Sequence, residues 1–124
     1  MDAPTTQDLL RAMLNKTLYV GIRKPSDLSR VPELLEEHLR WAIAAEQRGE
    51  IFASGPFVED GAAPGASGGL SVLRAGSVEE ARQILAGDPF IREGVFTVDV
   101  KKWVVMEGGL TLTVRFSDRS GRLL

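Results

Sequence analysis

The order of the secondary-structure patterns constrains this chain more than any other feature of its sequence. Two helical patterns lie at residues 32–48 and 77–86, and β-rich apolar segments surround them at residues 17–22, 50–57, 70–75 and 95–107. This β-α-β-β-α-β order is the split βαβ arrangement of a ferredoxin-like α+β fold, which places both helices on one face of the sheet. An extra C-terminal strand is expected at residues 110–116, where it either lengthens the sheet or pairs with another chain.

The first helical pattern contains the only histidine of the chain, His38. Apolar residues recur there at helical spacing and are expected to face the sheet, namely Leu35, Leu39, Ala42 and Ile43. His38 falls on the edge of this stripe, close enough to face the sheet and to reach a cleft, whereas Trp41 points elsewhere. Gly49 marks the end of the helix.

The second helical pattern begins at a capping box. The Ser77 hydroxyl is expected to accept an early helical N–H while Glu80 reaches back to the cap, and Gly87 marks the end of the helix. Between the two middle strands, residues 58–69 are rich in Gly, Ala and Pro. We expect them to form an irregular, mobile connection.

Both ends of the chain are expected to lie outside the folded domain. Residues 5–15 are expected either to form a short helix that needs a partner surface or to fray, and residues 117–124 are expected to form a frayed tail. The predicted organisation is therefore an N-terminal extension at 1–16, a single ferredoxin-like domain at 17–107, and a C-terminal strand with its tail at 108–124.

Composition and charge exclude several classes of function. The net charge is only -2, and the acidic and basic residues are interspersed, so neither nucleic acid nor an anionic membrane is an expected partner. The absence of cysteine excludes disulfides and thiolate chemistry, and a single histidine makes a conventional zinc site improbable. With neither a signal peptide nor a membrane-spanning apolar run, the protein is expected to be cytoplasmic.

The first strand predicts a homodimer. Leu18, Val20 and Ile22 point to one face of the sheet, opposite Tyr19 and Arg23, so both faces are expected to be at least partly buried. Both helices cover the same face, and a second copy of the chain is the economical cover for the other. We therefore expect a two-fold dimer, or a higher homo-oligomer, in which two sheets face each other.

Three segments together resemble a known family. "LYVGIR" looks like its opening strand, "HLRWAIAAEQRGEIFASGP" has a histidine-leucine on a helix followed by a strand ending in Gly-Pro, and "SVEEARQILAGDPFIREGVF" has a capped helix followed by an Asp-Pro-Phe turn. Over roughly residues 17–105 the chain resembles the YciI-like (YCII-related) family of small bacterial proteins with the dimeric α/β-barrel fold.

The resemblance implies an active-site dyad. In that family a helix histidine and the aspartate of the Asp-Pro-aromatic turn are thought to act together, and these correspond to His38 and Asp88. One relative removes chloride from a chlorinated hydroxyhydroquinone, and similar barrels isomerise lactones. The arginine common three residues before the histidine is Leu35 in this chain. Holding an anionic substrate would therefore fall to Arg23, Arg74 or Lys101, or else the substrate differs.

These residues suit general acid–base chemistry on a small cyclic, oxygenated compound. An imidazole can take and return a proton at cellular pH, and a carboxylate on one ring nitrogen fixes its tautomer. We predict His38 as base and then acid, with Asp88 as its orienter and with no metal or other cofactor. The residues expected to bind the small-molecule ligand are Tyr19, Arg23, Ser54, Phe90 and Trp103.

Plainer interpretations of the same residues exist. A histidine at a helix edge is often only a satisfied polar residue, and aspartate before proline is a common turn former. The chain could then be a non-catalytic dimeric module that binds a metabolite or assists a neighbouring enzyme, or a purely structural dimer. Under the binding-module hypothesis, His38 would lack a carboxylate partner or its pocket would be closed to ligands.

Overall fold

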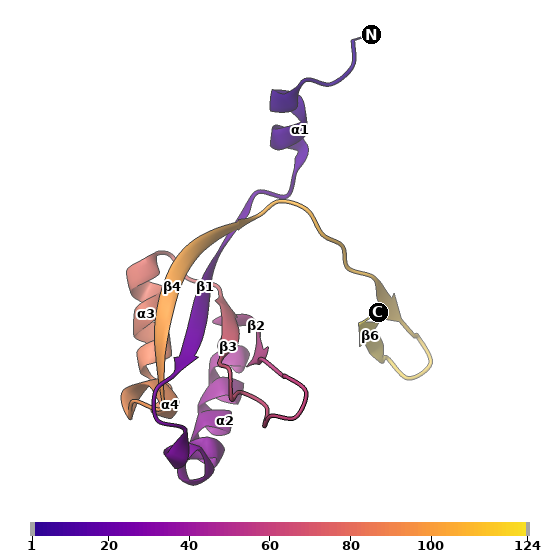
Figure 1. The fold of residues 1–124 in the computed structure, drawn as a ribbon. Helices are drawn as coiled ribbons and strands as arrows, with labels where there is room; N and C mark the ends of the chain where they lie inside the picture. Colours follow the sequence, from indigo (N-terminus) through magenta and orange to yellow (C-terminus); the bar gives the residue numbers. More distant parts are fainter. Residues whose placement is uncertain (1, 124) are drawn as a thin grey trace. The chain divides into compact units, whose positions relative to one another are not determined.

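Four strands form one sheet in the computed structural model, which describes residues 2–123. Along the chain they are β1 (Lys16–Pro25), β2 (Ile51–Pro56), β3 (Gly69–Leu73) and β4 (Phe96–Val105), and their order in the sheet is β2-β3-β1-β4 (Figure 1). Strand β3 runs antiparallel to both of its neighbours. Its residue Leu73 lies opposite Tyr19 of β1 and Ile51 of β2. This order confirms the predicted ferredoxin-like α+β fold.

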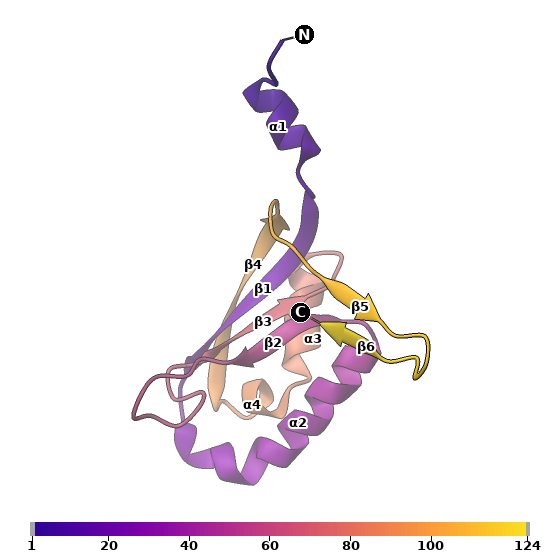
Figure 2. The ribbon, with the colours of Figure 1, turned by 90° about the vertical axis from the view of Figure 1, so that its right-hand side faces the viewer.

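The long helix α2 (Val31–Gln47) follows a 3-10 turn and has a proline in its first turn. Gly49 follows its end with a φ of 80°, a conformation that favours glycine. Figure 2 shows α2 and the helix α3 (Val78–Ala86) on the same side of the sheet. Among the described residues, no helix combines the length and the apolar character needed to cross a membrane.

The start of α3 follows the sequence signals with one difference. The Ser77 hydroxyl accepts a hydrogen bond from the Glu80 N–H at 3.0 Å, as the capping box predicts. The Glu80 carboxylate, however, accepts from the Gly76 N–H at 3.0 Å and not from the cap residue itself. A short helix, α4 (Pro89–Arg92), follows directly after Asp88.

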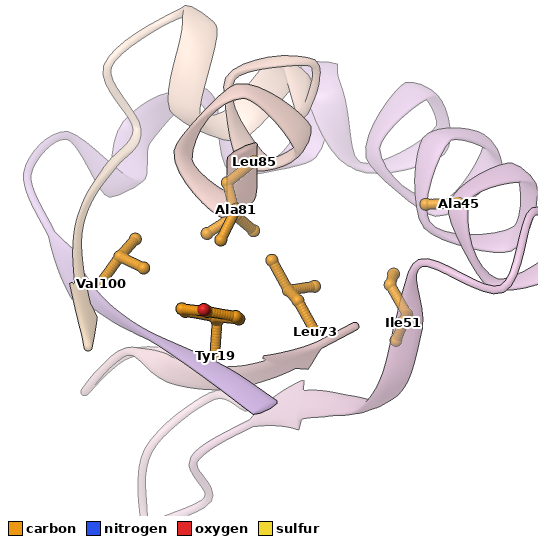
Figure 3. Packing of buried hydrophobic residues seen from close by; sticks show 7 residues of the cluster. All are labelled: Tyr19, Ala45, Ile51, Leu73, Ala81, Leu85 and Val100. Carbon is orange, nitrogen blue, oxygen red and sulfur yellow. The ribbon is translucent and has the colours of Figure 1, made fainter. Parts of the chain in front are cut away.

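Side chains from the sheet, α2 and α3 meet in the main hydrophobic core, as Figure 3 shows. Its buried members are Tyr19, Ala45, Ile51, Leu73, Ala81, Leu85 and Val100. Strand β1 can approach α3 closely because it carries Gly21 at this point. A Cβ there would lie 2.8 Å from Cδ1 of Leu85, which is closer than side-chain carbons approach in practice.

The face of α2 that packs on the sheet differs from the predicted one. Leu34, Trp41 and Ala45 point towards the two hydrophobic clusters, and His38 lies on the same inward side of the helix. The predicted stripe is instead turned outward: Ala42 is half-buried, and the exposed fractions are 42% for Leu35, 49% for Leu39 and 55% for Ile43. The expected orientation of the stripe was therefore wrong by about one residue of helical rotation.

The connection between β2 and β3 is irregular, as predicted, and backbone hydrogen bonds close it on itself. The Phe57 N–H donates to the Gly68 carbonyl at 2.9 Å, and the Gly65 N–H donates to the Phe57 carbonyl at 2.9 Å. Gly68 has a φ of 102°, and a Cβ there would lie 2.1 Å from the backbone oxygen of Arg23. Only glycine therefore lets this loop return so closely against β1.

Residues 2–16 and 104–123 form a unit separate from residues 17–103. Its helix α1 (Thr6–Ala12) begins at a complete capping box and has no buried residue.

Strand β5 (Leu112–Val114) pairs antiparallel with β6 (Gly121–Leu123) in a two-stranded sheet of its own. The strand expected at residues 110–116 is thus shorter than predicted and does not lengthen the large sheet. Its partner strand, β6, lies in the stretch that was expected to fray. Between the two strands, Asp118 accepts a hydrogen bond from the Ser120 N–H and forms a turn. Residue 124 lies outside the described residues.

Candidate active site

His38 and Asp88, 50 positions apart in the sequence, meet between α2 and α4. The distance from His38 Nδ1 to Asp88 Oδ1 is 2.8 Å. Helix α2 supplies the histidine from its inward face, and Asp88 is the N-cap residue of α4. The ring of Phe90, in the first turn of α4, stacks on the imidazole with 4.2 Å between ring centroids and 17° between planes. The position of the imidazole is therefore defined by a hydrogen bond at its edge and an aromatic ring on its face.

Asp88 is the centre of a buried polar network, and its exposed fraction is 0%. Its Oδ1 accepts from His38 and from the Phe90 N–H at 2.9 Å, while its Oδ2 accepts from Arg23 Nη1 at 2.5 Å. Burial acts to raise the pKa of Asp88, but the His38 hydrogen bond, the positive charge of Arg23 and the Phe90 N–H together hold it below its ordinary value. Asp88 is consequently ionised at neutral pH.

The ionisation of Asp88 determines the tautomer of the neutral His38 ring. An ionised carboxylate can only accept hydrogen bonds, so the proton that joins the pair sits on Nδ1 of His38. In the neutral ring, Nε2 therefore carries the lone pair. No residue described by the structure forms a hydrogen bond with Nε2, and 21% of the side chain is exposed. The arrangement leaves a basic nitrogen accessible for a ligand.

Arg23 comes from β1 and has an exposed fraction of only 7%. Its Nε donates to the Ser71 hydroxyl at 3.0 Å, and the Ser71 and Ser54 hydroxyls lie 3.2 Å apart. Its guanidinium also lies over the ring of Trp41, 5.9 Å from the centroid. The remaining amino group, Nη2, is buried and has no hydrogen-bond partner among the described residues. The network thus contains one charged donor group that forms no hydrogen bond with the described residues.

Three hollows adjoin His38. The polar recess has a volume of about 80 Å³, and its lining includes Arg23, His38, Ser54, Gly68, Phe90 and Phe96. The apolar groove, about 550 Å³, lies between α2 and the loop after β2, and its lining includes Leu28, Leu35, Leu39, Pro64, Phe90 and Phe96. The outer cleft, about 490 Å³, lies between α2 and β2, and its lining includes Ile43, Glu46 and Phe52.

Three of the five predicted ligand-binding residues, Arg23, Ser54 and Phe90, line the polar recess with His38. Tyr19 does not, because its ring is buried in the main core. Trp103 lines a different hollow of about 330 Å³, together with Val20 and Leu70. Alternation along the strands places that hollow on the opposite face of the sheet.

Of the three cations considered for binding an anion, only Arg23 lines the recess. Arg74 donates instead to the carbonyl groups of Gly49 and Ile51, and Lys101 is paired with Asp99 at 3.5 Å. The described residues contain no group of three or more His, Cys, Asp or Glu side chains that could hold a metal ion.

Sequence reasoning missed two contributors to the site. Ser71 is completely buried and connects Arg23 with Ser54. The sequence holds a signal for it: a serine two residues from Leu73 faces the helices from a central strand, and a buried hydroxyl there needs a hydrogen-bond partner. Phe96 lines both the recess and the groove. No local pattern distinguishes it from an ordinary core phenylalanine.

The fold and the site together define a small ferredoxin-like α+β protein with a histidine–aspartate pair beside a cleft. The chain belongs to the YCII-related family, because the model of the YCII-related domain matches residues 16–104. This confirms the resemblance found in the sequence.

A solved structure with a similar fold is 5-chloro-2-hydroxyhydroquinone dehydrochlorinase (TftG) from Burkholderia phenoliruptrix, in complex with 2,5-dihydroxybenzoquinone. The two chains are 22% identical, the alignment covers 74% of this chain and 95% of the other, and the TM-score is 0.59. At this identity, the likeness between the two chains shows a similar fold and nothing more. No curated protein matches the sequence.

Proposed function

We propose that this YCII-related protein is a cofactor-free lyase or isomerase that acts on a small cyclic oxygenated compound through general acid–base catalysis by His38 and Asp88. The observation that carries the proposal is the 2.8 Å hydrogen bond between His38 Nδ1 and the buried Asp88 carboxylate. It leaves Nε2 as the base, next to a recess lined by Arg23 and Ser54. The dehydrochlorinase with the similar fold offers a precedent for the reaction class.

In the proposed reaction, His38 Nε2 removes a proton from a hydroxyl group or from a carbon next to a carbonyl. The resulting oxyanion is stabilised by the positive charge of Arg23 and by the Ser54 hydroxyl, both of which line the recess. The imidazolium that forms is stabilised by Asp88. An isomerase then returns the proton to another atom of the substrate, whereas a lyase expels a leaving group such as chloride. General acid–base catalysis of this kind contributes about 10²–10⁴ to a rate.

The test is turnover by the purified chain with two substrate classes, using chloride release from chlorinated hydroxyhydroquinones and isomerisation of unsaturated lactones. His38→Gln should lower the rate by about 10²–10⁴. Arg40→Gln is the matched control, because Arg40 lies two residues further along α2 and is paired only with Glu36 at the surface. A His38→Gln rate within tenfold of wild type would remove His38 as the base. No turnover with either class would instead favour the metabolite-binding module.

The homodimer also remains a proposal. The sheet face opposite α2 and α3 carries a hollow lined by Val20, Leu70 and Trp103 together with Lys101 and Lys102, and its apolar members suit burial against a second copy. Sedimentation equilibrium should give a mass of at least two chains. Trp103→Glu should lower that mass, because the charge would be buried in the interface. A monomer at all concentrations would refute this assembly.

A further inference from the structure

The outward face of α2 carries apolar residues where a surface helix normally carries polar ones. Leu35 and Leu39 are exposed, although leucine at these positions would ordinarily pack on a sheet. Both line the apolar groove, which has a volume of about 550 Å³. This value lies within the range of about 300–1,000 Å³ that is typical of small-molecule sites. The groove thus gives a physical role to leucines that do not contribute to the core.

The apolar groove adjoins the polar recess. His38, Pro56, Phe90 and Phe96 line both hollows. The recess alone measures about 80 Å³, whereas a buried cavity of about 150 Å³ is known to hold one benzene molecule. The recess can therefore receive the oxygen substituents of a ligand, but the body of the ligand must extend into the groove.

The chemistry of the groove indicates what that body is. Apart from His38, no ionisable side chain of residues 2–123 lines it. Its far wall is the loop at residues 57–68, which the Phe57–Gly68 and Gly65–Phe57 backbone hydrogen bonds hold opposite α2. The outer cleft on the other side of His38 contains Glu46 and is a poorer place for an apolar group. A concave, uncharged hollow beside a base favours a small molecule over the flatter surface of a protein partner.

We infer that the ligand of this site is amphipathic, with an oxygen-bearing head in the polar recess and an apolar body larger than a bare ring in the apolar groove. This rests on the proposed function, because it takes His38 as the residue that contacts the head. It adds the substrate class: phenols or cyclic enols that bear an alkyl or aryl substituent.

The experiment measures the binding of phenol, 4-ethylphenol and 4-butylphenol to the full chain by NMR, following the ring signals of His38, which is the only histidine. Each added methylene should tighten the Kd by about fourfold, the equivalent of about 0.8 kcal/mol per buried CH₂. In Leu35→Gln this gain should shrink at least threefold for 4-butylphenol, while the Kd of phenol stays within twofold, because Leu35 lines the groove and not the outer cleft. Ile43→Gln is the matched control, because Ile43 is an exposed residue of the same helix and lines the outer cleft.

The possible outcomes separate this inference from the proposed function. If phenol shifts the His38 signals and chain length has no effect, the apolar body does not occupy the groove and the inference is overturned, while the head site stands. If Ile43→Gln abolishes the gain and Leu35→Gln does not, the body occupies the outer cleft. If no phenol shifts His38, the proposed function fails as well. If Leu35→Gln changes only the mass measured by sedimentation, the groove is an interface between copies.

Discussion

The buried pair of Arg23 and Asp88 makes a sharp prediction for Asp88→Asn. Asparagine keeps the size of the side chain and can still cap α4, but it removes the negative charge that faces Arg23 at 2.5 Å. Arg23 is almost completely buried, so water compensates little for the lost partner. Breaking one side of a buried ion pair costs about 3–5 kcal/mol. Since domains have total stabilities of about 5–15 kcal/mol, this is a large fraction of the whole.

The measurement is urea unfolding at pH 7, followed by tryptophan fluorescence. With a denaturant dependence of about 1.5 kcal/mol per M, the unfolding midpoint should fall by about 2 M or more. Glu36→Gln is the control, because it breaks an exposed pair with Arg40 at 3.1 Å. Such a pair is worth about 0–1 kcal/mol, so the midpoint should move by less than about 0.7 M.

A double-mutant cycle distinguishes the pair from other effects of the substitution. Arg23→Met removes the buried charge, so adding Asp88→Asn to it should cost much less than Asp88→Asn alone, with a coupling free energy of about 3 kcal/mol. Additive costs, or a cost of Asp88→Asn as small as that of Glu36→Gln, would refute the reasoning. Asp88 would then position His38 without holding a buried charge.

Three further outcomes are expected. Ser71→Ala removes the acceptor of Arg23 Nε and should lower the free energy of unfolding by about 1–3 kcal/mol in urea, because a buried charged donor is left unpaired. Gly68→Ala, at a φ of 102°, should lower the melting temperature, whereas Gly55→Ala, where an added Cβ meets nothing within 4 Å, should leave it nearly unchanged. Because the folded-state pKa of Asp88 is lowered, its stabilisation is complete above the unfolded-state value of about 3.9 and is lost as the pH falls through the lower folded-state value. The stability difference between wild type and Asp88→Asn should therefore narrow below about pH 4, as acid titrations of both proteins would show.

The order of the elements could be predicted because local signals agreed with one another. The cap at Ser77, the glycine at position 49 and the alternation along β1 each belong to one element and need no distant partner. The pairing of β5 with β6 was missed for the opposite reason. The cue that joins them is a turn around Asp118 in a polar stretch that resembles an ordinary disordered tail.

The face of α2 could not be predicted from hydrophobic periodicity. The inward face includes His38, and a polar ring can lie there only because Asp88, from a distant part of the chain, accepts its N–H. A periodicity argument assigns polar residues to solvent, so it predicted that Leu35 and Leu39 lie on the face of the helix that packs on the sheet. The histidine–aspartate pairing itself came from the family resemblance, and no spacing rule would have found it.

The unsatisfied amino group of Arg23 connects stability with the proposed chemistry. The buried guanidinium uses Nε and Nη1, and its Nη2 has no hydrogen-bond partner among the described residues. Replacing the buried Arg23–Asp88 pair by apolar residues would often be neutral or stabilising, so stability alone does not account for the arrangement. Under the proposed function the buried charge has a reason: Arg23 lines the recess, where its positive charge stabilises the oxyanion formed when His38 removes a proton. An interaction completed only as that charge develops lowers the barrier without tightening the binding of the neutral substrate.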